Sequence, residues 1–159
     1  MDQKKILVFG IGNPGRGDDG LGPKFVERLR GQASTDAEFK NSAPAGACDL
    51  EFRYQLNVED ALTIKDHDFV VFADATTTGE EPATVTEIFP SDAIAFTTHR
   101  MSPAAVLALC HELFGRAPRA YALAIRGYDW DIGESLSEQA ESNLELAIER
   151  FHELVEGLR

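Results

Sequence analysis

The sequence is poor in cysteine, in basic residues and in long apolar runs. Its 159 residues include only two cysteines, Cys48 and Cys110, which do not form a Cys-x-x-Cys pair. Because two cysteines are too few for a disulfide framework, we expect reduced thiols in a cytoplasmic protein. No apolar run approaches the ~20 residues that cross a bilayer, and the start of the sequence lacks the apolar segment of a signal peptide. These absences argue against secreted, disulfide-stabilised and membrane-inserted proteins.

Basic residues are outnumbered: 15 lysines and arginines stand against 27 aspartates and glutamates, which leaves a formal charge of −12. An acidic surface repels nucleic acid and anionic membranes, so we expect neither as a partner. A metal ion or a basic peptide is compatible with this charge. The hydrophobic fraction of 43% is ordinary for a globular protein, and the length predicts a single domain over residues 1–159.

Apolar segments of strand length alternate along the chain with segments of helical periodicity. The clearest strands are Ile6–Phe9 and Phe69–Ala73, which are continuously apolar, as buried parallel strands are. Further strands are expected at Leu50–Tyr54, Thr84–Phe89 and Tyr121–Ile125, and helices from Pro23, around Val58–Leu62, from Ser102-Pro103 and over Ala140–Leu158. The alternation predicts an α/β fold with a mostly parallel sheet covered on both faces. Ligands of such sheets lie beyond the carboxyl ends of the strands, which points to the loops after Phe9, Ala73 and Ile125.

A glycine-rich loop, Gly10–Gly22, follows the first expected strand. Its first three glycines have the G-x-G-x-x-G spacing of a dinucleotide site, which leaves a nucleotide-binding protein as one alternative. Such a site needs a helix N-terminus aimed at the pyrophosphate, but Pro23 predicts that the helix begins later. The adjacent carboxylates of Asp18 and Asp19 would also repel a phosphate.

Four residues of this chain are candidates for a metal site at one edge of the sheet. Asp18 or Asp19 could cap the next helix, but a cap needs one carboxylate, and two crowded carboxylates repel each other unless a cation binds. Asp74 follows the second buried strand, either as a turn residue or as a group facing the glycine loop. His99 precedes the helix start at Ser102 and can reach the same edge. Two carboxylates and one imidazole are suitable ligands for a divalent transition metal.

The glycine-rich loop, Asp74 and His99, taken in their order along the chain, resemble the motifs of the [NiFe]-hydrogenase maturation proteases. The similarity is carried by the loop Gly10–Gly22 with its paired acids, by Phe72-Ala73-Asp74-Ala75 and by Thr97-Thr98-His99. Ile125-Arg126-Gly127-Tyr128-Asp129-Trp130 and Leu136-Ser137 also look like that family, so the resemblance extends from Ile6 to about Leu158. It implies a three-layer αβα sandwich with a twisted, mostly parallel, five-stranded sheet.

The resemblance implies an endopeptidase that removes a C-terminal extension from the precursor of a [NiFe]-hydrogenase large subunit after nickel has been inserted. Asp19, Asp74 and His99 match the metal ligands of the family and would form the catalytic site. The Ni²⁺ ion would be supplied by the substrate, and Zn²⁺ or Cd²⁺ could substitute for it in the isolated protein. The protein would act as a monomer in the cytoplasm.

The mechanism stays open at this point. A bound metal could polarise the scissile carbonyl or activate a water, and a carboxylate could act as a general base. A nickel-binding maturation chaperone that uses the same three ligands without cutting its partner is an alternative from a different class of protein.

The remaining loop residues would support the site. Gly12, Asn13, Asp18, Gly20 and Gly22 match the family motif. We expect Asp18 to orient Asp19 or to cap the next helix. We expect the glycines to allow a sharp turn or the close approach of the precursor, with Gly20 or Gly22 facing it.

The chain departs from the family in one segment. Many members have a Gly-Gly-x-x-Gly loop after the second strand, where this chain has Tyr54-Gln55-Leu56-Asn57-Val58-Glu59. The departure implies that substrate recognition differs around this loop, as it would in a subgroup that serves a different class of hydrogenase.

Overall fold

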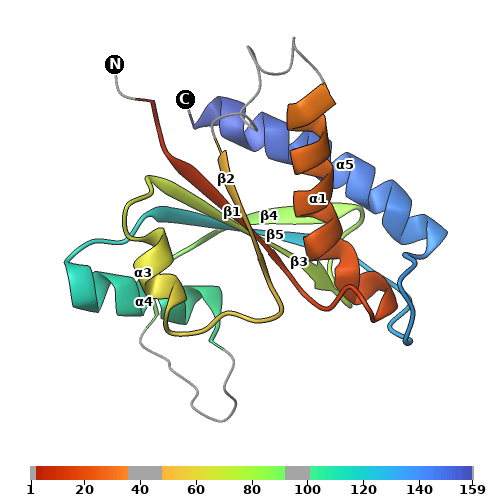
Figure 1. The fold of residues 1–159 in the computed structure, drawn as a ribbon, viewed down its shortest axis with the longest axis horizontal. Coiled ribbons are helices and arrows are strands. Elements are labelled where there is room, and N and C mark those ends of the chain that lie inside the picture. Colours follow the sequence, from red (N-terminus) through yellow and green to blue (C-terminus); the bar gives the residue numbers. More distant parts are fainter. Residues whose placement is uncertain (1–2, 36–47, 92–100, 159) are drawn as a thin grey trace.

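One five-stranded sheet forms the centre of the molecule. The computed structural model describes residues 3–35, 48–91 and 101–158. The strands lie in the order β2-β1-β3-β5-β4 (Figure 1). Their bounds are β1 Ile6–Ile11, β2 Cys48–Arg53, β3 Phe69–Thr76, β4 Ala83–Ile88 and β5 Arg119–Arg126. β2, β1, β3 and β5 are parallel, and β4 pairs antiparallel with β5 at one edge, so the predicted mostly parallel sheet is confirmed.

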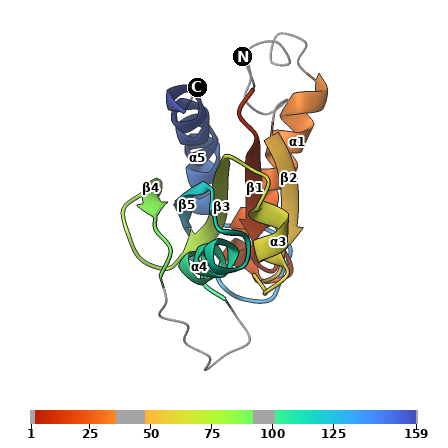
Figure 2. The same ribbon diagram turned by 90° about the vertical axis from the view of Figure 1, so that its left-hand side faces the viewer.

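Helices cover both faces of this sheet. The helical elements are η1 Gly17–Gly20, α1 Leu21–Thr35, α3 Asp60–Ile64, α4 Pro103–Phe114 and α5 Glu138–Gly157. α1 and α5 pack on one face, and α3 and α4 pack on the other (Figures 1 and 2). The three-layer αβα arrangement expected from the sequence is therefore confirmed.

The alternation of side chains in the central strands explains why both faces need a cover. In β1, Ile6 and Val8 point toward α1 and α5, whereas Leu7 and Phe9 point toward α3 and α4. Successive side chains of a strand lie on opposite faces. A strand that is apolar at every position is therefore stable only between two layers of helices.

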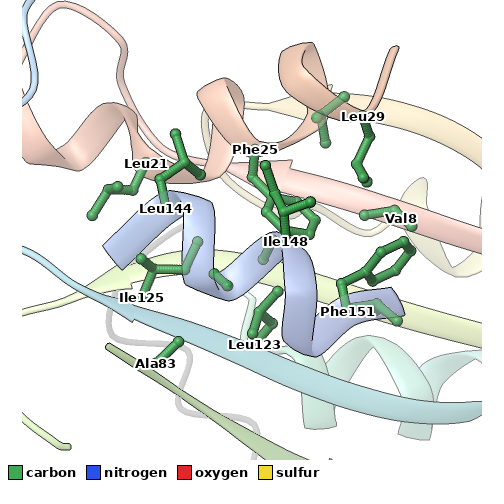
Figure 3. Close-up of a cluster of buried hydrophobic side chains, with 14 of the residues drawn as sticks. Val8, Leu21, Phe25, Leu29, Ala83, Leu123, Ile125, Leu144, Ile148 and Phe151 are labelled. Atoms are coloured by element: carbon green, nitrogen blue, oxygen red, sulfur yellow. The ribbon is translucent and has the colours of Figure 1, made fainter. Parts of the chain in front are cut away.

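Between α1, α5 and the sheet lies a core of aliphatic and aromatic side chains (Figure 3). Phe25 of α1 meets Phe151 of α5 edge to face, with ring centroids 5.5 Å apart. Both rings are fully buried, as is Leu144, which lies about two helical turns before Phe151 on α5. The apolar stripe predicted for the last helix is therefore the face that covers the sheet.

The helices α4 and α5 each begin at a serine N-cap. Ser102 caps α4 by accepting a hydrogen bond from the Ala105 amide at 3.1 Å, and Pro103 occupies the first helical position as predicted. Ser137 caps α5 in the same way through the Ala140 amide, at 3.2 Å. Each cap satisfies a helix donor that has no partner within the helix.

The start of α1 differs from the prediction. α1 begins at Leu21 rather than Pro23, because the short helix η1 runs directly into it. Pro23 lies in the first turn of α1, where a missing backbone N–H removes no intrahelical hydrogen bond. α1 continues to Thr35, so it includes Gly31.

Two expectations drawn from composition concern the thiols and the membrane. Neither Cys48 nor Cys110 forms a disulfide within the described chain. Cys110 is buried, and burial raises the pKa of its thiol, so that it remains protonated. Among the helices of residues 3–35, 48–91 and 101–158, none combines the length and the apolar character needed to cross a membrane.

Candidate active site at the carboxyl edge of the sheet

A cavity of about 390 Å³ lies at the carboxyl ends of the parallel strands. β1 and β3 are neighbours, and Ile11 at the end of β1 pairs with Asp74 of β3. Asp74 and Asp19 both line the cavity. The sequence prediction that the two strands share one crevice, and that these two carboxylates face it, is confirmed for the residues described.

Asp19 is placed by the loop that precedes α1. Its amide donates to the Arg16 carbonyl at 3.1 Å within η1, and its Oδ2 accepts from the Asn13 amide at 2.9 Å. The backbone of Gly12, at a φ of 140°, lies against the Asp19 carbonyl, and a Cβ atom at Gly12 would overlap that oxygen. Gly12 is therefore required both for its conformation and for the close contact. The loop holds Asp19 half-buried at the cavity wall.

Asp74 is held by the sheet itself. β3 continues to Thr76, so Asp74 is a strand residue paired with Ile11 on one side and with Ala124 of β5 on the other. Its Oδ1 accepts from the Ala75 amide at 2.8 Å. The interpretation of Asp74 as a turn residue is therefore wrong. A carboxylate on a strand flanked by two others is positioned more rigidly than one on a loop.

Asp18 lies in a different environment from Asp19. It is fully buried and lies outside the cavity. Its Oδ2 accepts from the Tyr128 amide at 2.7 Å, the Asp129 amide at 2.9 Å and the Ser137 hydroxyl at 2.7 Å. Its Oδ1 accepts from the Ser137 amide at 2.8 Å. The two carboxylates are therefore not crowded around one cation, and the interpretation of Asp18 as a cap of the following helix is wrong.

The protonation of Asp18 follows from these donors. Burial alone would raise the pKa of its carboxyl group, because burial disfavours the charged form. The amides of Asp129, Ser137 and Tyr128 and the hydroxyl of Ser137 outweigh burial, and the pKa lies below its ordinary value. Asp18 is thus a buried carboxylate that stays ionised at neutral pH.

His99, the third expected ligand, lies outside the described residues. Within residues 3–35, 48–91 and 101–158, no three His, Cys, Asp or Glu side chains gather as metal ligands. The described part of the site therefore contributes two carboxylates, Asp19 and Asp74. Their oxygen atoms fit a divalent cation, and an additional imidazole would suit nickel or zinc.

The glycines at the start of α1 serve packing. A Cβ atom at Gly22 would overlap the carbonyl oxygens of Ile11 and Ala73, so this glycine lets α1 approach the ends of β1 and β3. Gly20 is buried against the Cα atom of Pro14. The expectation that Gly20 or Gly22 faces a docked precursor is therefore wrong.

The same loop is unsuited to a dinucleotide. Gly15 does not open a helix: η1 follows it, and α1 begins only at Leu21. The cavity edge also carries the Asp19 carboxylate where a phosphate would need donors. The dinucleotide alternative is therefore not supported by the geometry.

Several residues that line the cavity could not be predicted from the sequence, because they are apolar or small. Ala122 and Ala124 of β5 line the cavity, and their small side chains leave its volume open. The alternating alanines at positions 120, 122 and 124 could have indicated the cavity, since small residues on one face of a central strand leave room above it. Tyr54, Gln55 and Leu56, from the segment that departs from the family pattern, form another part of the wall.

No protein-family model matches the chain, and no curated protein matches it in sequence. Solved structures do match over nearly the whole length. The [NiFe] hydrogenase maturation protease HycI from Thermococcus kodakarensis is 24% identical, with a TM-score of 0.66, and the match covers 96% of this chain and 93% of that one.

Two further maturation enzymes are similar. The hydrogenase maturating endopeptidase HybD from E. coli is 19% identical, with a TM-score of 0.65 over 92% of this chain and 89% of that chain. The hydrogenase 2 maturation peptidase from a Thaumarchaeota archaeon is 19% identical, with a TM-score of 0.63, and the match covers 96% of this chain and 98% of that one. The chain therefore has the fold of these proteins.

Proposed function

We propose that the chain is a hydrogenase maturation endopeptidase, which removes a C-terminal extension from the nickel-loaded precursor of a [NiFe]-hydrogenase large subunit. The observation that carries this proposal is the meeting of Asp19 and Asp74 in one cavity at the carboxyl edge of the sheet. The shared fold with named maturation proteases supports it. Such an enzyme would work in the cytoplasm, as a monomer, on its protein substrate.

Asp19, Asp74 and His99 are the residues that would hold the nickel ion of the precursor. Nickel supplies a Lewis acid next to the scissile bond. Asp19 is fixed by the Asn13 amide and Asp74 by the sheet, so neither carboxylate needs to reorganise when the precursor docks. This preorganisation favours the bound state because little side-chain freedom is lost.

The same carboxylates offer the chain's own route to proton transfer. Asp19 and Asp74 line one cavity, and a carboxylate beside a bound water can accept its proton as the water attacks a carbonyl carbon. One carboxylate can hold the ion while the other accepts the proton. The two-carboxylate wall is compatible with this division, and rate measurements on single variants would assign the roles.

Electrostatics supports a cation-bearing substrate. The chain carries a formal charge of −12, and the cavity adds two carboxylates at its wall. A negative cleft attracts a positively charged region of a partner and speeds its encounter. Tyr54, Gln55 and Leu56 would contact the precursor beside the bond that is cut.

Cleavage of a defined precursor tests the proposal. The large-subunit precursor, prepared with and without nickel, is incubated with the protein, and its intact mass is measured over time. The nickel-loaded precursor should lose one C-terminal peptide, and the nickel-free precursor should keep its mass. The Asp19→Asn variant, added in equal amount, should leave both precursors uncut.

Two outcomes would contradict the proposal. Equal cleavage of the two precursors would remove nickel from recognition. A nickel-loaded precursor that binds the protein and keeps its full mass would favour the maturation chaperone.

A further inference from the structure

A buried carboxylate next to the cavity ties two distant segments together. The Asp18 clamp consists of the Asp18 carboxylate, the amides of Tyr128, Asp129 and Ser137, and the Ser137 hydroxyl, with donor–acceptor distances of 2.7–2.9 Å. Charge-assisted hydrogen bonds of this length are stronger than those between neutral groups. A fully buried carboxylate with four donors is a fixed point in the structure.

Backbone hydrogen bonds extend the clamp on both sides of Asp18. The Asp18 amide donates to the Asp129 carbonyl at 2.7 Å, and the Gly17 amide donates to the Gly133 carbonyl at 2.8 Å. The Gly133 amide returns a hydrogen bond to the Gly15 carbonyl at 2.9 Å. The loop before α1 and the segment between β5 and α5 are therefore joined along several residues.

The Ser137 hydroxyl connects the clamp to α5. Its oxygen accepts from the Ala140 amide as the helix cap, and its single proton is donated to Asp18 Oδ2. A serine hydroxyl has one donor, so both of its roles are determined by these partners. The negative charge of Asp18 also lies near the positive end of the 20-residue helix α5, where it is stabilised.

Asp19 is on the other side of the same short helix. η1 presents Asp18 to the segment between β5 and α5, and presents Asp19 to the cavity. The Asp19 carboxylate is then held by the Asn13 amide at 2.9 Å. A rotation of η1 that loosened Asp18 would therefore move Asp19 away from the cavity wall.

We propose that Asp18 is a positioning residue: its clamp to Tyr128, Asp129 and Ser137 fixes the orientation of η1, and thereby the placement of Asp19 in the cavity. The role of Asp19 in cleavage rests on the proposed function, whereas the placement of Asp19 by Asp18 does not. The segment between β5 and α5 is thus part of the machinery that sets the site, although it contributes no lining residue to the cavity.

The Asp18→Asn variant tests the inference at nearly constant volume. Its side-chain amide keeps one acceptor oxygen and puts an NH₂ group in the place of the other carboxylate oxygen. In either orientation that NH₂ group faces at least one N–H donor of the clamp. The readout is hydrogen exchange of the Asn13 amide, whose hydrogen bond to Asp19 reports the position of that carboxylate. We expect exchange at Asn13 to be about tenfold faster and the cleavage rate to fall by about tenfold or more.

A matched control separates positioning from general loss of stability. Val155→Ala removes buried atoms from the far end of α5 and lowers the melting temperature without touching the clamp. The variant and the wild type are compared at temperatures equally far below their own melting temperatures. In that comparison, Val155→Ala should have the same exchange of the Asn13 amide and the same cleavage rate as the wild type.

A second variant covers the case in which Asp18→Asn does not fold. Ser137→Ala removes the hydroxyl donor and keeps the three amide donors, so it should speed exchange at Asn13 by a smaller factor. Unchanged exchange at Asn13 in the folded clamp variants would overturn the inference. Faster exchange at Asn13 in the clamp variants, together with a wild-type protein that fails to cut the nickel-loaded precursor, would keep the inference and overturn the proposed function.

Discussion

The two faces of the sheet are made from the same alternating strands, yet they are filled in different ways. On one face, α1 and α5 cover the strands with long apolar side chains such as Phe25 and Phe151. On the other face, α3 and α4 cover part of the sheet, and the cavity with Asp19 and Asp74 opens beyond them. A close-packed layer supplies stability, whereas an open layer leaves room for a substrate. The fold thus places a close-packed core on one face of the sheet and the candidate site on the other.

The largest effects on stability are expected on the supporting face. Phe151→Ala and Leu144→Ala should each lower the free energy of unfolding by about 2–5 kcal/mol, because both side chains are fully buried between α5 and the sheet. Leu146→Ala on the same helix, which is 43% exposed, should have little effect. Urea denaturation measures the difference. Losses below about 1 kcal/mol for both buried positions would mean that α5 is not part of the core.

Gly22→Ala should lower stability at the contact between α1 and the ends of β1 and β3. The added methyl group overlaps the carbonyl oxygens of Ile11 and Ala73, so α1 must move away from β1 and β3, at a cost of about 1–3 kcal/mol. Gly31→Ala in the same helix has open space at its Cβ position and should stabilise the protein slightly. Thermal unfolding of the two variants checks this contrast, and equal effects of both would show that α1 is not in tight contact with the strand ends.

Substitutions of the three expected ligands should affect metal binding instead of stability. Asp19→Asn, Asp74→Asn and His99→Ala should each weaken the binding of Ni²⁺, Zn²⁺ or Cd²⁺ by about tenfold, or about 1.4 kcal/mol. Asp68→Asn, at the opposite end of the sheet where Asp68 accepts from the Lys5 amide, removes the same charge and serves as the control. Titration calorimetry measures the affinities. Unchanged binding in all three variants would show that these residues are not the ligands.

The smallest effect concerns pH on the supporting face. Burial lowers the pKa of His152 on α5 below 6.5, against the smaller opposing influence of Glu156. As the pH falls through 6.5, the unfolded chain takes up a proton before the folded one does, so folding stability decreases until the folded-state pKa is reached. His152→Gln should lose less stability than the wild type over this range. Melting temperatures near pH 7.5 and pH 5.5 measure the difference, and identical pH dependence would contradict the account.

Much of the fold could be predicted because its signals are local. The continuous apolar runs of β1 and β3, the Ser102-Pro103 cap and the apolar stripe of α5 each lie within a few neighbouring residues. The start of α1 was placed too late because Pro23 is a helix-start signal of its own, whereas the glycine-rich residues of η1 carry no helical pattern.

The candidate site could be predicted only in part, for a physical reason. Asp19 and Asp74 were found because parallel strands bring their carboxyl ends to one edge, a rule that needs no knowledge of distant contacts. The partners of Asp18 lie 110 to 119 residues away, and nothing near Asp18 in the chain indicates them. A buried carboxylate with distant donors therefore looked the same in the sequence as a metal ligand or a helix cap.

One measurement tests the division between the two faces most directly. The rate of cleavage of the nickel-loaded precursor is compared for Asp74→Asn and Phe151→Ala, at a temperature where both variants are folded. We expect Asp74→Asn to keep its melting temperature and lose cleavage by about a hundredfold or more, or about 2.7 kcal/mol of transition-state stabilisation. Phe151→Ala should melt far below the wild type and still cut at nearly the normal rate. Normal cleavage by Asp74→Asn would contradict the account.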